Sequence, residues 1–153
     1  MSKIFKILVV FLFALILFAC SQTSQIGRIY TTEEADKLFG VVIYSESINS
    51  SVLAGLLERT DKIIMFGLIN KHLIILDNNR HLLYPERADF KDTDVFTSYD
   101  TGVVREILSV NSNKNNDNGS EIIDVEQRRE VLSVSSGSYT LETGLKCPPN
   151  CIN

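Results

Sequence analysis

Three apolar runs separated by short polar turns constrain the fold of this chain more than any other feature. The runs cover residues 62–69 (KIIMFGLI), 72–76 (HLIIL) and 81–84 (HLLY). Asn70-Lys71 and residues 77–80 separate them, and Asn and Asp tolerate the left-handed conformations that hairpin turns need. The runs therefore predict a three-stranded antiparallel meander. Because the first two runs are apolar at successive positions, both of their faces should be buried at the centre of a sheet.

A second set of three short apolar runs lies nearer the carboxyl end of the chain. These runs cover residues 122–125, 131–134 and 139–141 and predict a second meander. The mixed charges of the segment EQRRE at 126–130 indicate a solvated turn rather than a contact patch.

Apolar residues with helical spacing predict three short helices, over 33–39, 51–59 and 101–109. Thr31 and Thr32 stand before two Glu residues at the start of the first helix. A Thr N-cap and acidic side chains in the first turn both suit the helix dipole.

The expected fold class is therefore α+β. A single compact domain over 31–146 should contain two antiparallel meanders, about six or seven strands in all, packed with two or three short helices. Further short strands are expected at 41–44 and 95–96, and the polar stretch NSNKNNDNGS at 111–120 should form a mobile surface loop. Each meander follows a helix, which is a weak internal repeat. The residue identities match poorly, so duplication and the common placing of helices beside meanders both remain open.

The composition fits one folded domain and excludes several kinds of site. The chain has 153 residues, of which 44% are hydrophobic and 22% charged. Its net charge of −4 does not favour nucleic acid as a partner. Two His exclude a His-rich metal site, and three Cys exclude a four-Cys zinc site. We expect no cofactor and no metal.

The first 19 residues read as a processing signal rather than as part of the fold. Lys3 and Lys6 precede residues 7–19, thirteen positions without a polar side chain. This length suits the apolar region of a signal peptide, about 7–15 residues. A membrane span needs about 20 apolar residues. Residues 20–30 (CSQTSQIGRIY) then read as a polar tether.

The residues Leu17-Phe18-Ala19-Cys20 resemble the lipobox of bacterial lipoprotein signal peptides. The resemblance covers about the first 21 residues and implies cleavage before Cys20 and lipidation of its thiol, with the membrane as partner through that lipid. In proteobacterial lipoproteins an Asp after the Cys favours the inner membrane. Ser21 takes that place here, so the resemblance favours the outer membrane if the source is Gram-negative. The domain would then face the periplasm or the exterior. A plain secretory signal or an uncleaved anchor is the alternative reading of residues 1–19.

The tail at 147–153 contains the pair Cys147 and Cys151 around Pro148-Pro149-Asn150. Outside the cytoplasm a disulfide is the default for such a pair. It closes a small loop, so its role should be to lock the last residues. Free or intermolecular thiols, or a redox or metal site, are the alternatives.

An acidic segment over 89–94 carries Asp89, Asp92 and Asp94. Calcium favours oxygen-rich loops, but the spacing does not fit the twelve-residue EF-hand loop. A solvated acidic loop is the simpler interpretation. His72 and His81 fall at distant positions of one predicted hairpin and should not converge on a metal. We find no G-x-S-x-G, G-x-G-x-x-G or P-loop motif, and no catalytic residue is predicted.

Two classes of function follow from these features. The first is a lipid-anchored envelope protein that acts as a non-catalytic binding, scaffold or inhibitor module for an unidentified envelope protein or wall ligand. The alternative is a small hydrolase that uses carboxylates of the 86–94 region, such as Glu86, Asp89, Asp92 or Asp94. A cleft holding two of these carboxylates would favour the enzyme.

Overall fold

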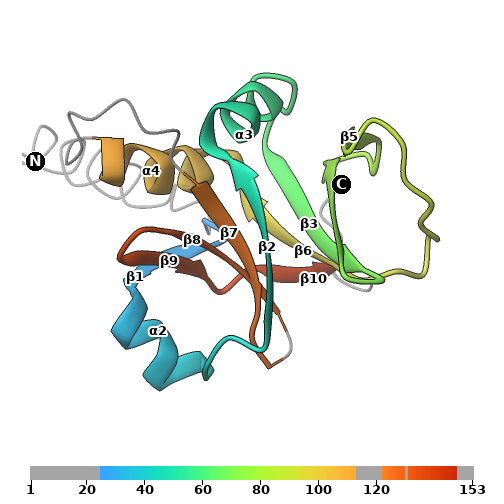
Figure 1. Ribbon diagram of the computed structural model, residues 1–153. Helices are drawn as coiled ribbons and strands as arrows, with labels where there is room; N and C mark the ends of the chain where they lie inside the picture. Colours follow the sequence, from blue (N-terminus) through green and yellow to red (C-terminus); the bar gives the residue numbers. More distant parts are fainter. Residues whose placement is uncertain (1–24, 113–121, 130, 148–153) are drawn as a thin grey trace, which may run out of the picture.

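The computed structural model describes residues 25–112, 122–129 and 131–147 of the chain. The signal peptide, Cys20, most of the predicted loop at 111–120 and the tail beyond Cys147 lie outside the described residues. Within them the chain forms ten strands in two antiparallel sheets and three helices, which confirms the α+β prediction (Figure 1).

The two sheets contain five strands each. The first has the order β1 (Arg28–Thr31), β9 (Tyr139–Glu142), β8 (Leu132–Ser136), β7 (Ile122–Gln127) and β2 (Tyr44–Asn49). The second has the order β10 (Leu145–Cys147), β6 (Phe96–Asp100), β3 (Ile63–Ile69), β4 (His72–Asp77) and β5 (Leu82–Tyr84). The helices are α2 (Thr32–Phe39), α3 (Ser50–Leu57) and α4 (Thr101–Ser112).

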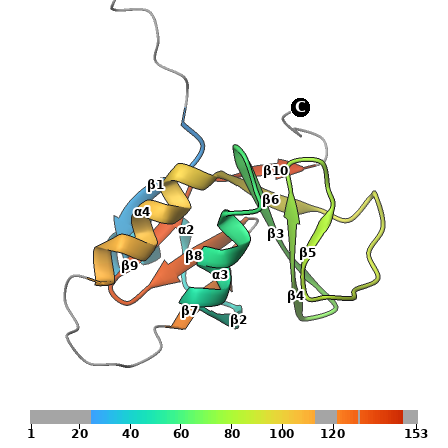
Figure 2. The ribbon, with the colours of Figure 1, turned by 90° about the horizontal axis from the view of Figure 1, so that it is seen from above.

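The two predicted meanders are β3-β4-β5 and β7-β8-β9, and each follows a helix as the weak repeat suggested. The strand before each helix joins the meander of the other unit: β2 precedes α3 but pairs with β7, whereas β6 precedes α4 but pairs with β3. This exchange links the two halves through their sheets. The helices α3 and α4 lie beside each other on one side of the sheets (Figures 1 and 2).

The central strands β3 and β4 are buried on both faces, as predicted. Ile64 and Phe66 of β3 point into the larger core, which lies between the two sheets and the helices α3 and α4. Ile63 and Met65 point to a smaller cluster on the opposite face, where Phe96 also packs. Alternate side chains of a strand face opposite sides, so one apolar run supplies both cores.

Helix α2 begins as the sequence predicted, with a reciprocal capping box. The Thr31 hydroxyl accepts from the Glu34 N–H (3.3 Å), and the Glu34 carboxylate accepts from the Thr31 N–H (3.0 Å). Asn49 caps α3 in a similar way by accepting from the Ser51 N–H (2.9 Å). These local bonds satisfy N–H groups that a helix start leaves unpaired.

The strand predicted at 41–44 is wrong. Val41 and Ile43 are exposed, and β2 runs instead over the more polar sequence YSESIN. Only Ile48 of that strand is fully buried. The strand therefore forms where inward-facing and outward-facing side chains alternate, and not at the continuous apolar run of residues 41–43, which no helix or strand covers.

The folded part also begins earlier than the predicted boundary at residue 31 and contains more strands than predicted. Ile26 is buried and β1 starts at Arg28, within the segment expected to be tether. The strand β10 at the other end was not predicted either. Both are short edge strands whose pairing with β9 and β6 depends on distant residues rather than on their own apolar pattern.

Candidate functional site

The acidic segment folds into the loop between β5 and β6, and its carboxylates do not converge. Asp94 is used internally, because its Oδ2 atom accepts from the Lys91 N–H (2.7 Å). Asp89 and Asp92 are exposed, as is Glu86. Of the four, Asp89 lines the cleft described below. Among the residues that the structure describes, no group of three or more His, Cys, Asp or Glu is arranged to hold a metal ion.

The interior of this loop is occupied by the guanidinium of Arg80. One of its terminal nitrogens lies 3.3–3.4 Å from the carbonyl oxygens of Lys91, Asp92 and Asp94. The guanidinium carbon also stands 5.0 Å from the centre of the Phe96 ring. Carbonyl oxygens that a calcium loop would use are therefore already engaged by a side-chain cation.

The two histidines lie far apart along the β4–β5 hairpin, as expected: His72 begins β4 and His81 directly precedes β5. His81 Nδ1 is 3.0 Å from Asp77 Oδ2 at the end of the strand. His72 is the first residue of β4 and lines the cleft described below.

Cys147 ends β10 and is fully buried against the smaller core. It is disulfide-bonded. The other two cysteines, Cys20 and Cys151, both lie outside the described residues, so the Cys147–Cys151 pairing stays a prediction.

The segment at 126–130 departs from the predicted solvated turn at Arg128, while Gln127 and Arg129 are exposed and Glu130 lies outside the described residues. The Arg128 side chain is fully buried and contacts three carboxylates: Asp36 (2.5 Å), Glu126 (2.9 Å) and Glu142 (3.1 Å). We call these four residues the Arg128 cluster. Arg128 also donates to the Gly40 carbonyl (2.6 Å), so the cluster ties α2 to β7 and β9. The local sequence around Arg128 could not predict this burial, because two of its partners, Asp36 and Glu142, are distant in the sequence.

Glu142 is the most enclosed carboxylate of the Arg128 cluster, with a side chain of 0% exposure. Burial raises its pKa, while a hydrogen bond from Ser133 (2.6 Å) and the Arg128 charge oppose the shift. Among the described residues, its Oε2 atom has no hydrogen-bond partner, and the Arg128 Nε atom contacts Glu142 Oε1 as an ion pair without forming a hydrogen bond. Arg128 and Glu142 are therefore shielded from solvent, whereas the Asp36 carboxylate at the edge of the cluster stays exposed.

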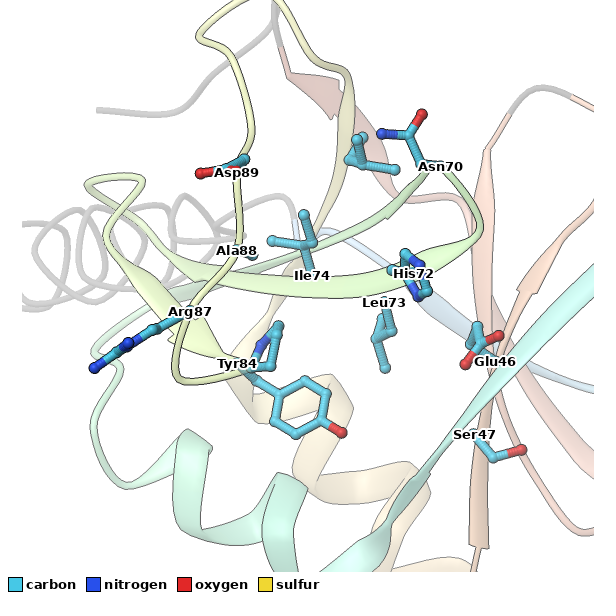
Figure 3. Close-up of a pocket in the computed structure, with 12 residues that line it drawn as sticks. Glu46, Ser47, Asn70, His72, Leu73, Ile74, Tyr84, Arg87, Ala88 and Asp89 are labelled. Atoms are coloured by element: carbon cyan, nitrogen blue, oxygen red, sulfur yellow. The ribbon is translucent and has the colours of Figure 1, made fainter.

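A cleft between β2 of the first sheet and β4–β5 of the second encloses about 510 Å³. Ligand pockets usually measure about 300–1,000 Å³. Figure 3 shows its construction from three parts of the chain. Glu46 and Ser47 come from β2 on one side, His72 and Leu73 from β4 at the centre, and the last group from β5 and the loop after it: Tyr84, Pro85, Arg87, Ala88 and Asp89.

The floor of the cleft is apolar and its rim is charged. Leu73 is buried on the face of β4 that packs in the larger core, where Tyr84 is half-buried, and Ile74 is buried on the opposite face, next to Ala88. His72, Arg87 and Asp89 are exposed. None of these three side chains makes a hydrogen bond or an ion pair with any residue described in the structure.

Glu46 is the most enclosed charged group of the cleft, being half-buried. It accepts a hydrogen bond from the Tyr44 hydroxyl. This bond raises the pKa of Tyr44, with burial adding to the shift. The Tyr44 hydroxyl also lies 2.8 Å from the Lys71 carbonyl, so it connects β2 to the β3–β4 turn at one end of the cleft. The sequence offered no signal for Glu46, since its role depends on the distance between two sheets.

Comparison with protein-family models, with curated proteins and with solved structures finds no match for this chain. None of the helices in the described ranges is long and apolar enough to cross a membrane.

Proposed function

We propose that the protein is a lipid-anchored bacterial envelope protein whose domain is a non-catalytic binding module. The observation that carries the proposal is the cleft: an apolar floor is bordered by exposed charged residues that have no partner among the described residues. Sites of this kind bind ligands through apolar contact and a few polar groups. A cleft holding two carboxylates of the 86–94 region would favour the hydrolase alternative, and of these carboxylates Asp89 alone lines this cleft.

The position of the cleft supports a module that works above a membrane. The Ile26 N–H donates to Asp100 Oδ2 (2.6 Å), and Ile26 packs in the same cluster as Cys147 of β10. In Figure 2 the first described residues and β10 lie on one side of the domain, whereas β2 and the β3–β4 turn lie on the opposite side. A chain from a lipidated Cys20 to Gln25 would span at most about 18 Å. The cleft would then open away from the bilayer.

The anchor is tested by mass spectrometry of the protein from the membrane fraction, compared with Cys20→Ser. We expect a wild-type mass equal to residues 20–153 plus acyl chains, less two hydrogens for a Cys147–Cys151 disulfide. An unacylated wild-type mass would contradict the lipid anchor and the envelope localisation that depends on it.

The cleft is tested by site-specific photo-cross-linking in intact cells. A photoreactive residue replaces His72 at the rim of the cleft, and the control replaces Glu106, which is exposed on α4. We expect adducts from position 72 and none from position 106. Equal adducts from both positions, or none from either, would contradict a binding role for the cleft.

A further inference from the structure

The four edge strands of the two sheets differ in how well they are protected from pairing with another chain. β10 and β5 have three residues each, and the pairing of β5 with β4 is irregular before Pro85 follows. β1 has four residues. Short strands, irregular pairing and Pro are ordinary protections of a sheet edge.

β2 has none of these protections. It is the longest edge strand, with six residues, and it pairs with β7 in unbroken register from Tyr44 to Asn49. Within the described part of the chain no strand pairs with its other edge. The backbone groups on that edge can therefore form a ladder with an added strand.

The cleft adjoins this free edge. Glu46 and Ser47 of β2 form one wall, and β4 with the β5 loop forms the rest (Figure 3). A strand added to β2 would place some of its side chains in the cleft, over Leu73 and Tyr84. Recognition by strand addition combines these two parts: the backbone ladder gives affinity and the side-chain pocket gives specificity.

We infer that the free edge of β2 and the cleft together bind an extended peptide segment of a partner protein. This inference rests on the proposed binding function and specifies its ligand class. Charge complementarity supports a basic side chain in the segment, because Glu46 is the most enclosed charged group of the cleft, whereas Arg87 and Asp89 on its rim are of opposite sign. The apolar floor accepts an apolar side chain. Since alternate residues of a strand share a face, the apolar and basic residues stand two positions apart.

The probe is a phage-displayed library of random linear peptides, selected against the full-length protein. Selected peptides should share the pattern apolar-x-basic. Glu46→Gln keeps an acceptor for Tyr44 but removes the charge. We expect it to weaken binding of the selected peptides about tenfold, which corresponds to about 1.4 kcal/mol. The matched control, Glu106→Gln, changes an exposed carboxylate on α4 and should leave affinity unchanged.

Two backbone measurements test strand addition itself. Two sets of peptides are compared, one methylated at the odd-numbered and one at the even-numbered backbone nitrogens. Only one set should bind more weakly, because a strand bonds to its neighbour through every second N–H group. Hydrogen exchange should show added protection at those β2 amides that do not bond to β7. Binding that depends on Glu46 but shows neither effect would overturn strand addition while leaving the cleft as a ligand site.

The remaining outcomes separate the inference from the proposed function. If no peptide is selected but small organic fragments shift the NMR resonances of cleft residues, the peptide class is wrong and the binding function stands. If neither peptides nor fragments bind, both fail. If the free protein dimerises through β2 in sedimentation experiments, the edge is covered by a second copy and the inference of a foreign peptide is overturned.

Discussion

The Arg128 cluster and the cleft each contain cationic and anionic side chains, but the two regions use them in opposite ways. In the cluster one buried guanidinium is surrounded by Asp36, Glu126 and Glu142. In the cleft the charges of Arg87 and Asp89 remain exposed and without partners among the described residues. Buried charges need partners inside the protein, whereas charges exposed to water need none and remain accessible to a ligand. The first region is therefore structural, and the second is available for binding.

The largest expected effect is on the Arg128 cluster. Arg128→Leu would leave Glu142 buried without its cation. Removing one partner of a buried ion pair costs about 3–5 kcal/mol, so the free energy of unfolding should fall by that amount in urea titration. The control Arg129→Leu changes an exposed neighbour and should cost less than about 0.5 kcal/mol. Similar losses for both variants would mean that the cluster is not a structural unit.

A smaller effect is expected at Arg80. This residue is structural, like Arg128, but the loop that it holds also carries Asp89 of the cleft. Arg80→Ala removes the contacts to three carbonyl oxygens and to the Phe96 ring. We expect a loss of about 1–3 kcal/mol in the free energy of unfolding, as for hydrogen bonds from a charged group.

Arg80→Lys provides the matched control, since an ammonium keeps the charge but lacks the planar fork. It should recover only part of the loss. A full recovery would show that charge alone, and not the geometry of the guanidinium, holds the loop. If Arg80→Ala is neutral, the loop that forms one side of the cleft is held by other contacts.

The framework of the fold could be predicted from sequence because it depends on local patterns. The runs at 62–69 and 72–76 are apolar at successive positions, and they become the central strands β3 and β4. The Thr31 cap and the apolar spacing at 101–109 similarly place α2 and α4. The edge strands β1, β2 and β10 could not be placed in this way, because their pairing partners lie far away in the chain.

The candidate site was less predictable than the fold. Asp89 and His72 were noticed for their residue types, but neither was expected in a common cleft. Glu46 and Tyr84 join them only through the approach of β2 to β4 and β5. Arg128 shows the same limit, since its burial requires Glu142 from another strand. The spacing of residues in the sequence predicts which side chains lie together on one helix or strand. The residues of the cleft and of the Arg128 cluster come from different elements and meet only when those elements pack together.

A modest effect with a specific pH dependence is expected for Glu142→Gln. Arg128 keeps Asp36 and Glu126 in this variant, and the amide oxygen can still accept from Ser133, so stability near neutral pH should change by less than about 1 kcal/mol. Burial raises the pKa of Glu142 above its ordinary value of 4.5 in the folded state. A raised carboxyl pKa favours the folded protein below that ordinary value, and the contribution disappears as the pH rises through the folded pKa.

The measurement is the difference in free energy of unfolding between wild type and Glu142→Gln as a function of pH. The wild type should gain stability relative to the variant as the pH falls through the folded pKa of Glu142. A difference that does not change with pH would show that Glu142 has the same pKa in the folded and unfolded states.

The smallest effect on stability is expected in the cleft itself. Arg87→Ala with Asp89→Ala removes two exposed side chains that contact no described partner. Substitutions of this kind usually change the free energy of unfolding by less than about 0.5 kcal/mol. The same double variant should lower the yield of adducts from a photoreactive residue at position 72, because the rim charges would no longer orient a ligand. Loss of stability without loss of adducts would place these residues with the Arg128 cluster as structural groups, and the distinction between the two regions would fail.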